Sequence, residues 1–178
     1  MIWGLPKKVF IYIVSAIVIV GLITSIFVYS KIKPSKPAKK TSVVVSKELK
    51  EYRDTSGFMF KFPQNIQLKK NENVNNKTYS DIALFSSQSS GMISIKIEDT
   101  QYNSLEEWKN KKKDIISSGS PKPIFLSGMN AMEATTKDGI TAASIDKNVL
   151  YIIQVSFKDN RSFWQDVYAA VVSTFSRF

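Results

Sequence analysis

The feature that most constrains this chain is an uninterrupted apolar segment close to its first residue. Residues 9–30 read VFIYIVSAIVIVGLITSIFVYS and contain no charged side chain. As a helix that rises about 1.5 Å per residue, this segment would span roughly 33 Å, close to the thickness of the hydrocarbon core of a bilayer. Trp3 and Tyr29 lie near its two ends, where aromatic rings favour the membrane interface. The pattern therefore predicts a single transmembrane helix after a short tail, residues 1–8.

A cleaved signal peptide is the main alternative interpretation of this segment. The apolar core of a signal peptide usually has about 7–15 residues. The present run is longer, which favours an uncleaved anchor. Attachment through a lipid-modified cysteine is excluded, because the chain contains no cysteine.

Lysines flank the predicted helix on both sides, and residues 1–40 contain no acidic side chain. We expect these lysines to contact anionic lipid head groups, each contributing about 1 kcal/mol near the surface. The candidates for this contact are Lys7, Lys8, Lys31, Lys33, Lys36, Lys39 and Lys40. The larger number follows the helix, so the positive-inside rule by itself favours a cytoplasmic domain. Large domains are translocated largely regardless of charge, so the orientation stays open at this point.

A linker and one globular domain follow the predicted helix. Residues 31–51 are rich in lysine and contain Pro34 and Pro37, which favour extended chain. Residues 52–178 have the composition and the length of a single domain. Most of the net charge of +10 lies in the first 40 residues. A nucleic-acid-binding protein is expected to carry its basic excess on the folded domain, so that function is disfavoured.

Alternation of apolar and polar residues predicts several strands in the domain. Turn sequences at residues 137–139 and 146–148 separate the later strands by short connections, which predicts an antiparallel meander. The predicted strands are 58–62, 66–68, 82–84, 93–97, 124–126, 131–136, 140–145 and 151–157.

Two helices are predicted beside these strands. Ser104 and Glu107 have the spacing of a capping box, and the helix that they begin has Leu105, Trp108, Ile115 and Ile116 on its apolar side. The second helix is predicted to begin near Ser162, with Gln165 at the capping position. The fold class is therefore α+β, with helices packed on an antiparallel sheet.

The chain contains neither histidine nor cysteine, and this limits its chemistry. It excludes disulfides, Cys/His metal sites and every catalytic mechanism that depends on either residue. Ser144 and Lys147 match the S-x-x-K pattern of serine acyl-enzymes, but they lie in a predicted hairpin and the partner motifs are missing. The acid pairs 98–99 and 106–107 are expected to have structural roles. We assign no catalytic, metal or cofactor residue.

Several short motifs give the domain a resemblance to a known family. They are GFMFKFP at 57–63, SLEEW at 104–108, a strand over 128–134, YII at 151–153 and STFSRF at 173–178. With these motifs, residues 52–178 resemble the PsbP-like family, named for an extrinsic subunit of photosystem II. The resemblance implies an α/β/α-type sandwich, a non-enzymatic role, and a bacterial protein that is secreted or membrane-anchored. It supplies no functional residues, and this chain has no histidine to match a histidine-based metal site.

We expect the first of three functions that are compatible with these sequence features, and the other two are alternatives. The first is a non-enzymatic binding or accessory domain, tethered to the cell membrane by one helix and facing outward, with an unidentified protein or small-ligand partner. The second is a cytoplasm-facing scaffold whose basic segment lies on anionic lipid. The third is an enzyme with an unrecognised acid- or serine-based site. A pocket lined by convergent polar groups is expected to favour the third, and an exposed apolar patch is expected to favour a protein partner.

Overall fold

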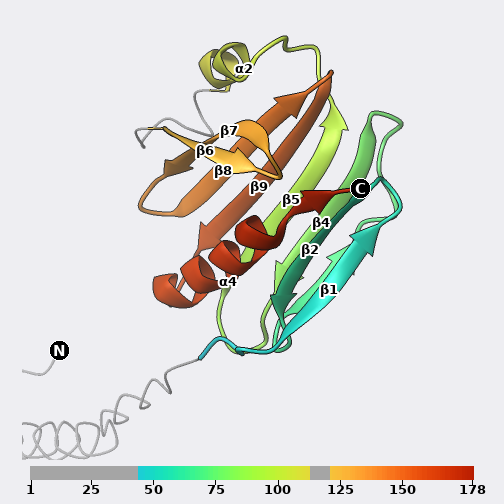
Figure 1. Ribbon diagram of the computed structural model, residues 1–178. Coiled ribbons are helices and arrows are strands. Elements are labelled where there is room, and N and C mark those ends of the chain that lie inside the picture. The colour runs from blue at the N-terminus through green and yellow to red at the C-terminus, as the bar shows by residue number, and fades with distance from the viewer. Residues whose placement is uncertain (1–43, 113–120) are drawn as a thin grey trace, which may run out of the picture. The chain divides into compact units, whose positions relative to one another are not determined.

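The computed structural model describes residues 44–112 and 121–178 (Figure 1). The predicted transmembrane helix, the tail and the candidate lipid-contacting lysines Lys7, Lys8, Lys31, Lys33, Lys36, Lys39 and Lys40 lie outside these residues. Within the two described ranges, no helix is long and apolar enough to cross a membrane. The described chain belongs to one compact unit, Ser42–Phe178.

A seven-stranded antiparallel sheet forms the centre of the domain, with strand order β3-β4-β5-β9-β8-β7-β6. The predicted meander from β6 to β9 is confirmed, because each of these strands pairs with the next in the sequence. Lys147 and Asn148 both have positive φ, as a two-residue hairpin turn between β8 and β9 requires. The strands are β3 (Gln67–Lys70), β4 (Thr78–Phe85), β5 (Gly91–Asp99), β6 (Lys122–Leu126), β7 (Met129–Thr135), β8 (Gly139–Asp146) and β9 (Val149–Phe157).

A second sheet, which the sequence pattern did not distinguish from the first, has the order β1-β2-β10. Its strands are β1 (Leu49–Asp54), β2 (Phe58–Pro63) and β10 (Ser176–Arg177). The alternation that predicted β2 is confirmed, because Phe58, Phe60 and Phe62 are all buried. β1 takes in residues 49–51, which the sequence pattern assigns to the linker.

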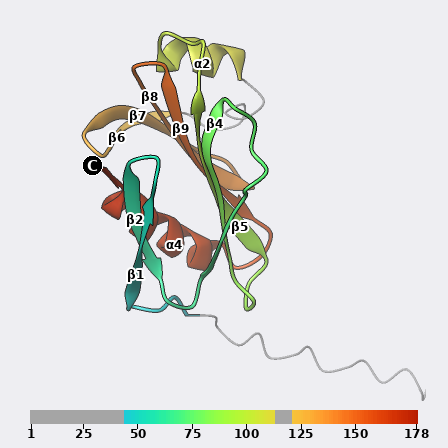
Figure 2. The ribbon, with the colours of Figure 1, turned by 90° about the vertical axis from the view of Figure 1, so that its right-hand side faces the viewer.

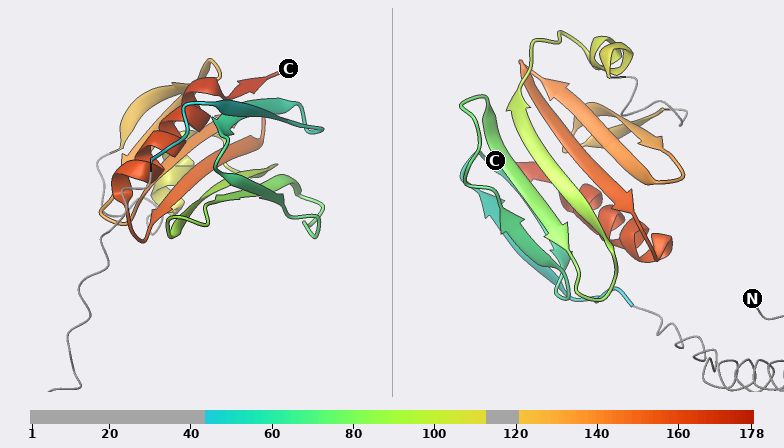
Figure 3. Two further views of the ribbon diagram at one scale, coloured as in Figure 1. Left: turned by 90° about the horizontal axis from the view of Figure 1, so that it is seen from below. Right: turned by 180° about the vertical axis from the view of Figure 1, so that it is seen from behind.

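The small sheet and helix α4 (Arg161–Thr174) lie side by side over one face of the large sheet, as Figure 2 and the left view of Figure 3 show. Together they enclose the main hydrophobic core. Trp164 and Val167 from α4 meet Phe60 from β2 and Ile95 from β5 in this core, and all four side chains are almost fully buried. The mixed α+β class with antiparallel sheets and helices packed on them is therefore confirmed.

The other face of the large sheet carries helix α2 (Leu105–Lys111). Neighbouring side chains on a strand point to opposite faces, so Ala142 reaches the main core while Ala143 joins a second cluster. Trp108 is the large side chain that α2 contributes to this cluster, and it is 1% exposed. The predicted cap is confirmed, because the Ser104 hydroxyl accepts a hydrogen bond from the Glu107 backbone N–H. The helix ends at Lys111, and Ile115 and Ile116 lie outside the described residues.

The capping box predicted for α4 is wrong. The helix begins at Arg161, and its N-cap is Asn160, which has a φ of 38° and makes no side-chain capping bond. The Ser162 hydroxyl donates to the side-chain carbonyl of Asn160 at 3.2 Å instead of serving as the cap. Asparagine adopts the left-handed conformation more readily than most residues, which lets the chain reverse sharply between β9 and α4.

Candidate functional site

The S-x-x-K pattern does not form a catalytic site. Ser144 lies within β8, is fully buried, and donates its hydroxyl to the backbone carbonyl of Asn130 at 2.8 Å. Lys147 occupies the following hairpin turn, with a φ of 52°. The hydroxyl is therefore engaged by the neighbouring strand, which is a structural role.

The paired acids noted in the sequence also have partners. Glu98 forms an ion pair with Lys96 at 2.6 Å, and Asp99 accepts a hydrogen bond from the Tyr79 hydroxyl. In α2, Glu106 pairs with Lys109, and Glu107 accepts from the backbone N–H of Asn103 at 2.9 Å. In the described part of the chain, no group of three or more acidic side chains is placed to hold a metal ion.

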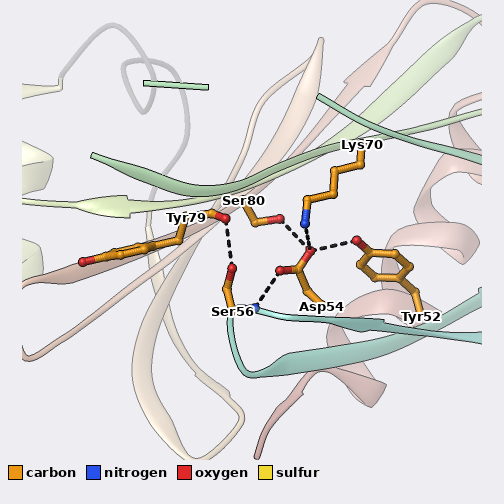
Figure 4. Close-up of polar contacts among 6 residues, drawn as sticks. All are labelled: Tyr52, Asp54, Ser56, Lys70, Tyr79 and Ser80. Carbon is orange, nitrogen blue, oxygen red and sulfur yellow. Dashed lines mark hydrogen bonds and ion pairs between the residues drawn. The ribbon is translucent and has the colours of Figure 1, made fainter. Parts of the chain in front are cut away.

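A buried carboxylate, that of Asp54 at the end of β1, lies within a cluster of polar contacts (Figure 4). Its Oδ1 accepts from the Ser56 backbone N–H at 2.9 Å. Its Oδ2 accepts from the Tyr52 hydroxyl at 2.7 Å and from the Ser80 hydroxyl at 3.0 Å. The Lys70 ammonium lies 2.9 Å from the same oxygen. The donors come from both sheets, so this carboxylate joins β1 to β3 and β4.

Electrostatics keep this carboxylate ionised. Burial by itself opposes ionisation, but the hydrogen bonds from Ser56, Lys70 and Tyr52 outweigh it and hold the pKa of Asp54 well below its ordinary value. Burial and the hydrogen bond to Asp54 raise the pKa of Tyr52. A general base needs a free lone pair directed at a substrate, whereas both oxygens of Asp54 already accept hydrogen bonds. We therefore assign Asp54 and its donors a role in stabilising the fold and not in catalysis.

A cavity of about 440 Å³ lies where β5 ends and the chain turns toward α2. Backbone hydrogen bonds shape its walls: Asp99 N–H donates to the Lys77 carbonyl at 2.7 Å, and Thr100 N–H donates to the Asn148 carbonyl at 2.8 Å. Segments from four parts of the sequence therefore meet here. The lining residues are Lys77, Glu98, Asp99, Thr100, Gln101, Tyr102, Trp108, Lys112 and Leu150.

The cavity combines an apolar wall with two lysines. Tyr102, Trp108 and Leu150 belong to the second hydrophobic cluster and supply the wall. The ammonium groups of Lys77 and Lys112 form no ion pair or hydrogen bond with the described residues. Of the two acids in the lining, Glu98 is paired with Lys96, and Asp99 accepts a hydrogen bond from the Tyr79 hydroxyl. No serine, histidine or cysteine lines the cavity. Such a site can bind a small molecule that carries a negative charge next to an apolar group.

The sequence pattern did not predict this cavity. Lys112 follows directly after α2, and nothing in the local pattern distinguishes it from the neighbouring lysines Lys109 and Lys111. The one local feature that could have indicated a cavity is the short segment 100–102, which joins the end of a strand directly to a capped helix. Lys77 and Leu150 are far from it in the sequence, so only the folded chain brings them together.

No family model matches this chain, and no curated protein matches it. Among solved structures, the chain is similar to the solution structure of cyanobacterial PsbP (CyanoP) from Synechocystis sp. PCC 6803. The two are 12% identical with a TM-score of 0.48, over 78% of this chain and 96% of that one. The likeness concerns the fold, and no residue role or partner is transferred from that protein. Membership of the PsbP-like family stays a prediction.

Proposed function

We propose that this protein is a membrane-tethered binding domain, not an enzyme, and that the cavity between β5 and α2 is its binding site. The observation that carries this proposal is the pair of lysines, Lys77 and Lys112, that lie beside an apolar wall without an ion-pair partner among the described residues. A lysine ammonium that lacks a counter-charge favours an anionic ligand. We expect the ligand to be a carboxylate attached to a ring or to a short apolar chain.

Two features favour binding over catalysis. The cavity has one aliphatic hydroxyl, that of Thr100, which accepts from the Tyr102 N–H at 3.2 Å, and in the described part of the chain no hydrogen bond links it to an acid or lysine of the lining. The most perturbed acid among the described residues, Asp54, is sealed between the sheets. Non-enzymatic recognition is the simplest function that these contacts support.

The tether is proposed from the sequence. Residues 9–30 are long enough and apolar enough to span a bilayer, and the domain is proposed to face outward. Protease treatment of intact cells tests the orientation, because the lysine-rich residues 31–43 offer sites to trypsin. Loss of the domain while a cytoplasmic marker survives supports the outward orientation. Protection that ends on lysis supports the cytoplasm-facing scaffold instead.

Ligand binding is tested with two probes that share a ring and differ in charge. The full-length protein in detergent is titrated with 4-fluorophenylacetate and with 4-fluorophenethylamine, and the fluorine signal is followed by NMR. We expect the carboxylate to bind and the amine to bind at least about tenfold more weakly, since each ammonium can form a charge-assisted hydrogen bond only with the anion. Equal binding of the two probes, or binding of neither, would overturn the assignment of an anionic ligand.

Matched variants locate the binding. Lys77→Gln combined with Lys112→Gln removes both cavity charges and is expected to weaken the carboxylate about tenfold. Lys158→Gln removes an exposed lysine outside the cavity and is expected to have no effect. An equal loss in both variants would show that general electrostatics, and not this cavity, determines the binding.

A further inference from the structure

Several strands begin or end at one end of the domain, which we call the Val44 end. β1 begins there, and Gln64 N–H donates to the Glu48 carbonyl at 2.9 Å, which places the end of β2 beside it. β3 starts directly afterwards, and its first residue, Gln67, pairs with the last residue of β4, Phe85. β5 then begins at Gly91, opposite Phe157 of β9. Figure 1 shows these strand ends together at the lower edge of the domain.

Exposed apolar side chains gather at the Val44 end. Val44 is 73% exposed and Leu49 is 42% exposed beside the start of β1. Phe85 and Met92 are 36% and 41% exposed on either side of the β4–β5 connection. These four account for more than half of the exposed large apolar side chains in the described residues; the others are Tyr79, Phe125 and Phe178. Such a concentration at one end of a domain indicates a contact surface.

Basic side chains surround this apolar group. Lys47, Lys50 and Lys158 lie at the Val44 end, and none of them forms an ion pair among the described residues. Arg161 is exposed at the start of α4, and its guanidinium carbon lies over the Phe157 ring, 5.0 Å from the ring centroid. Acids lie among them as well: Glu48 is exposed between Lys47 and Leu49, and Asp159 accepts from the Ser89 hydroxyl at 2.6 Å. The surface is therefore apolar at its centre and positively charged around it.

The chain that precedes Val44 identifies the partner. Only residues 31–43 separate the predicted membrane helix from the first described residue, and five of them are lysines. Even when fully extended, this segment reaches at most roughly 45 Å, so the Val44 end lies within that distance of any bilayer that holds the helix. A surface that combines exposed apolar side chains with lysines is suited to an anionic membrane interface.

We propose that the Val44 end docks on the anionic bilayer surface, with Leu49, Phe85 and Met92 entering the interfacial region. This inference rests on the proposed tether. Its consequence concerns the cavity: β5 runs from the docked end to the cavity over Gly91–Asp99, roughly 30 Å at about 3.3 Å per residue. The cavity is then held away from the lipid and open to ligands in the aqueous phase.

Single labelled cysteines test the docking, and the absence of native cysteine makes each label unique. Full-length Met92→Cys and Phe85→Cys variants carry an environment-sensitive NBD group and are reconstituted into vesicles of phosphatidylglycerol and phosphatidylcholine. Gln101→Cys, at the cavity end of β5, is the matched control. Nitroxide-labelled lipid is expected to quench the Met92 and Phe85 labels about twofold or more above the control. Equal quenching at Met92 and Gln101 would overturn the docking.

Two further measurements separate this proposal from the tether itself. A label at Ile19→Cys, inside the predicted span, is expected to be quenched by a nitroxide at mid-bilayer depth; if it is not, the tether fails and not only the docking. A Lys47→Glu and Lys158→Glu double variant is expected to lower quenching at Met92, whereas Lys147→Glu, in the hairpin turn near the cavity, is expected to leave it unchanged. An unchanged Met92 signal in the double variant contradicts docking through lipid charge.

Discussion

The carboxylate of Asp54 in β1 lies 2.9 Å from the ammonium of Lys70 in β3, so an ion pair joins strands that belong to different sheets. The Asp54 side chain is fully buried, whereas the Lys70 side chain is 27% exposed. The carboxylate therefore depends on its four donors to offset the loss of hydration. Because the donors come from both sheets, the small sheet is fixed over β3 and β4 by polar contacts as well as by the phenylalanine core.

Replacing this carboxylate is expected to destabilise the domain. Asp54→Asn keeps the shape of the side chain but removes the charge that Lys70 faces, and it turns an acceptor into a donor. We expect a loss of about 3 kcal/mol in the free energy of unfolding at pH 7, measured by urea denaturation. Asp138→Asn is the control, because Asp138 is exposed in a turn and is expected to change stability by less than about 0.5 kcal/mol. Equal losses in the two variants would contradict the role given to Asp54.

The contribution of Asp54 depends on pH, and its sign follows from the lowered pKa. In the folded protein the Asp54 carboxylate stays ionised even below about pH 3.9, the ordinary pKa of an aspartate. Its full contribution to the free energy of unfolding is therefore present above that pH. It is lost as the pH falls through the lower folded pKa. The stability difference between the wild type and Asp54→Asn is therefore expected to be constant from about pH 5 to 7 and to shrink steadily below about pH 4. A difference that grows on acidification would rule out this account.

A glycine is required where β5 begins. Gly91 has a φ of 136°, and a Cβ at this position would lie 2.4 Å from Trp164 Nε1 and 2.7 Å from the Ser156 carbonyl oxygen. The Trp164 indole N–H donates to the Ser90 carbonyl at 3.0 Å, so the ring is not free to move away. Gly91→Ala is expected to lower the free energy of unfolding by about 3 kcal/mol or more, because the clash and the strained backbone act together.

Gly128→Ala separates these two contributions. Its φ is 75°, but an added Cβ would meet nothing within 4 Å. We expect a cost of about 1 kcal/mol from backbone strain alone, measured by the same denaturation experiment. If Gly91→Ala costs no more than Gly128→Ala, the close approach of Trp164 does not constrain the fold.

Periodicity in the sequence is sufficient to predict the strands that bury apolar side chains. Phe58, Phe60 and Phe62 alternate within β2, and β5 shows the same pattern in its isoleucines, so the predicted strands match the observed ones closely. The Ser104 cap and the hairpin turn at 147–148 are also local signals, and both are confirmed. These features depend on neighbouring residues, which is why a single sequence reveals them.

Features that depend on distant partners were not predicted. β1 places Tyr52 and Asp54 on its inner face, and a buried acid breaks the apolar alternation that would have marked the strand. Its partners Lys70 and Ser80 lie 16 and 26 residues further along, so the sequence gives no sign of the contact. The cavity was missed for the same reason, since its walls come from residues 77, 98–102, 108, 112 and 150.

Trp108 provides the last test, because it is the main side chain that attaches α2 to the sheet. It is 1% exposed and packs with Met132, Ala143 and Leu150 in the second cluster. Trp108→Ala is expected to cost about 3–5 kcal/mol in unfolding free energy, as deletion of a buried aromatic side chain usually does. Trp108→Phe keeps most of the apolar contact and is expected to cost clearly less. A loss below about 1 kcal/mol in the alanine variant would mean that α2 is not held on the sheet by this residue, and the cavity beside it would then lack a fixed wall.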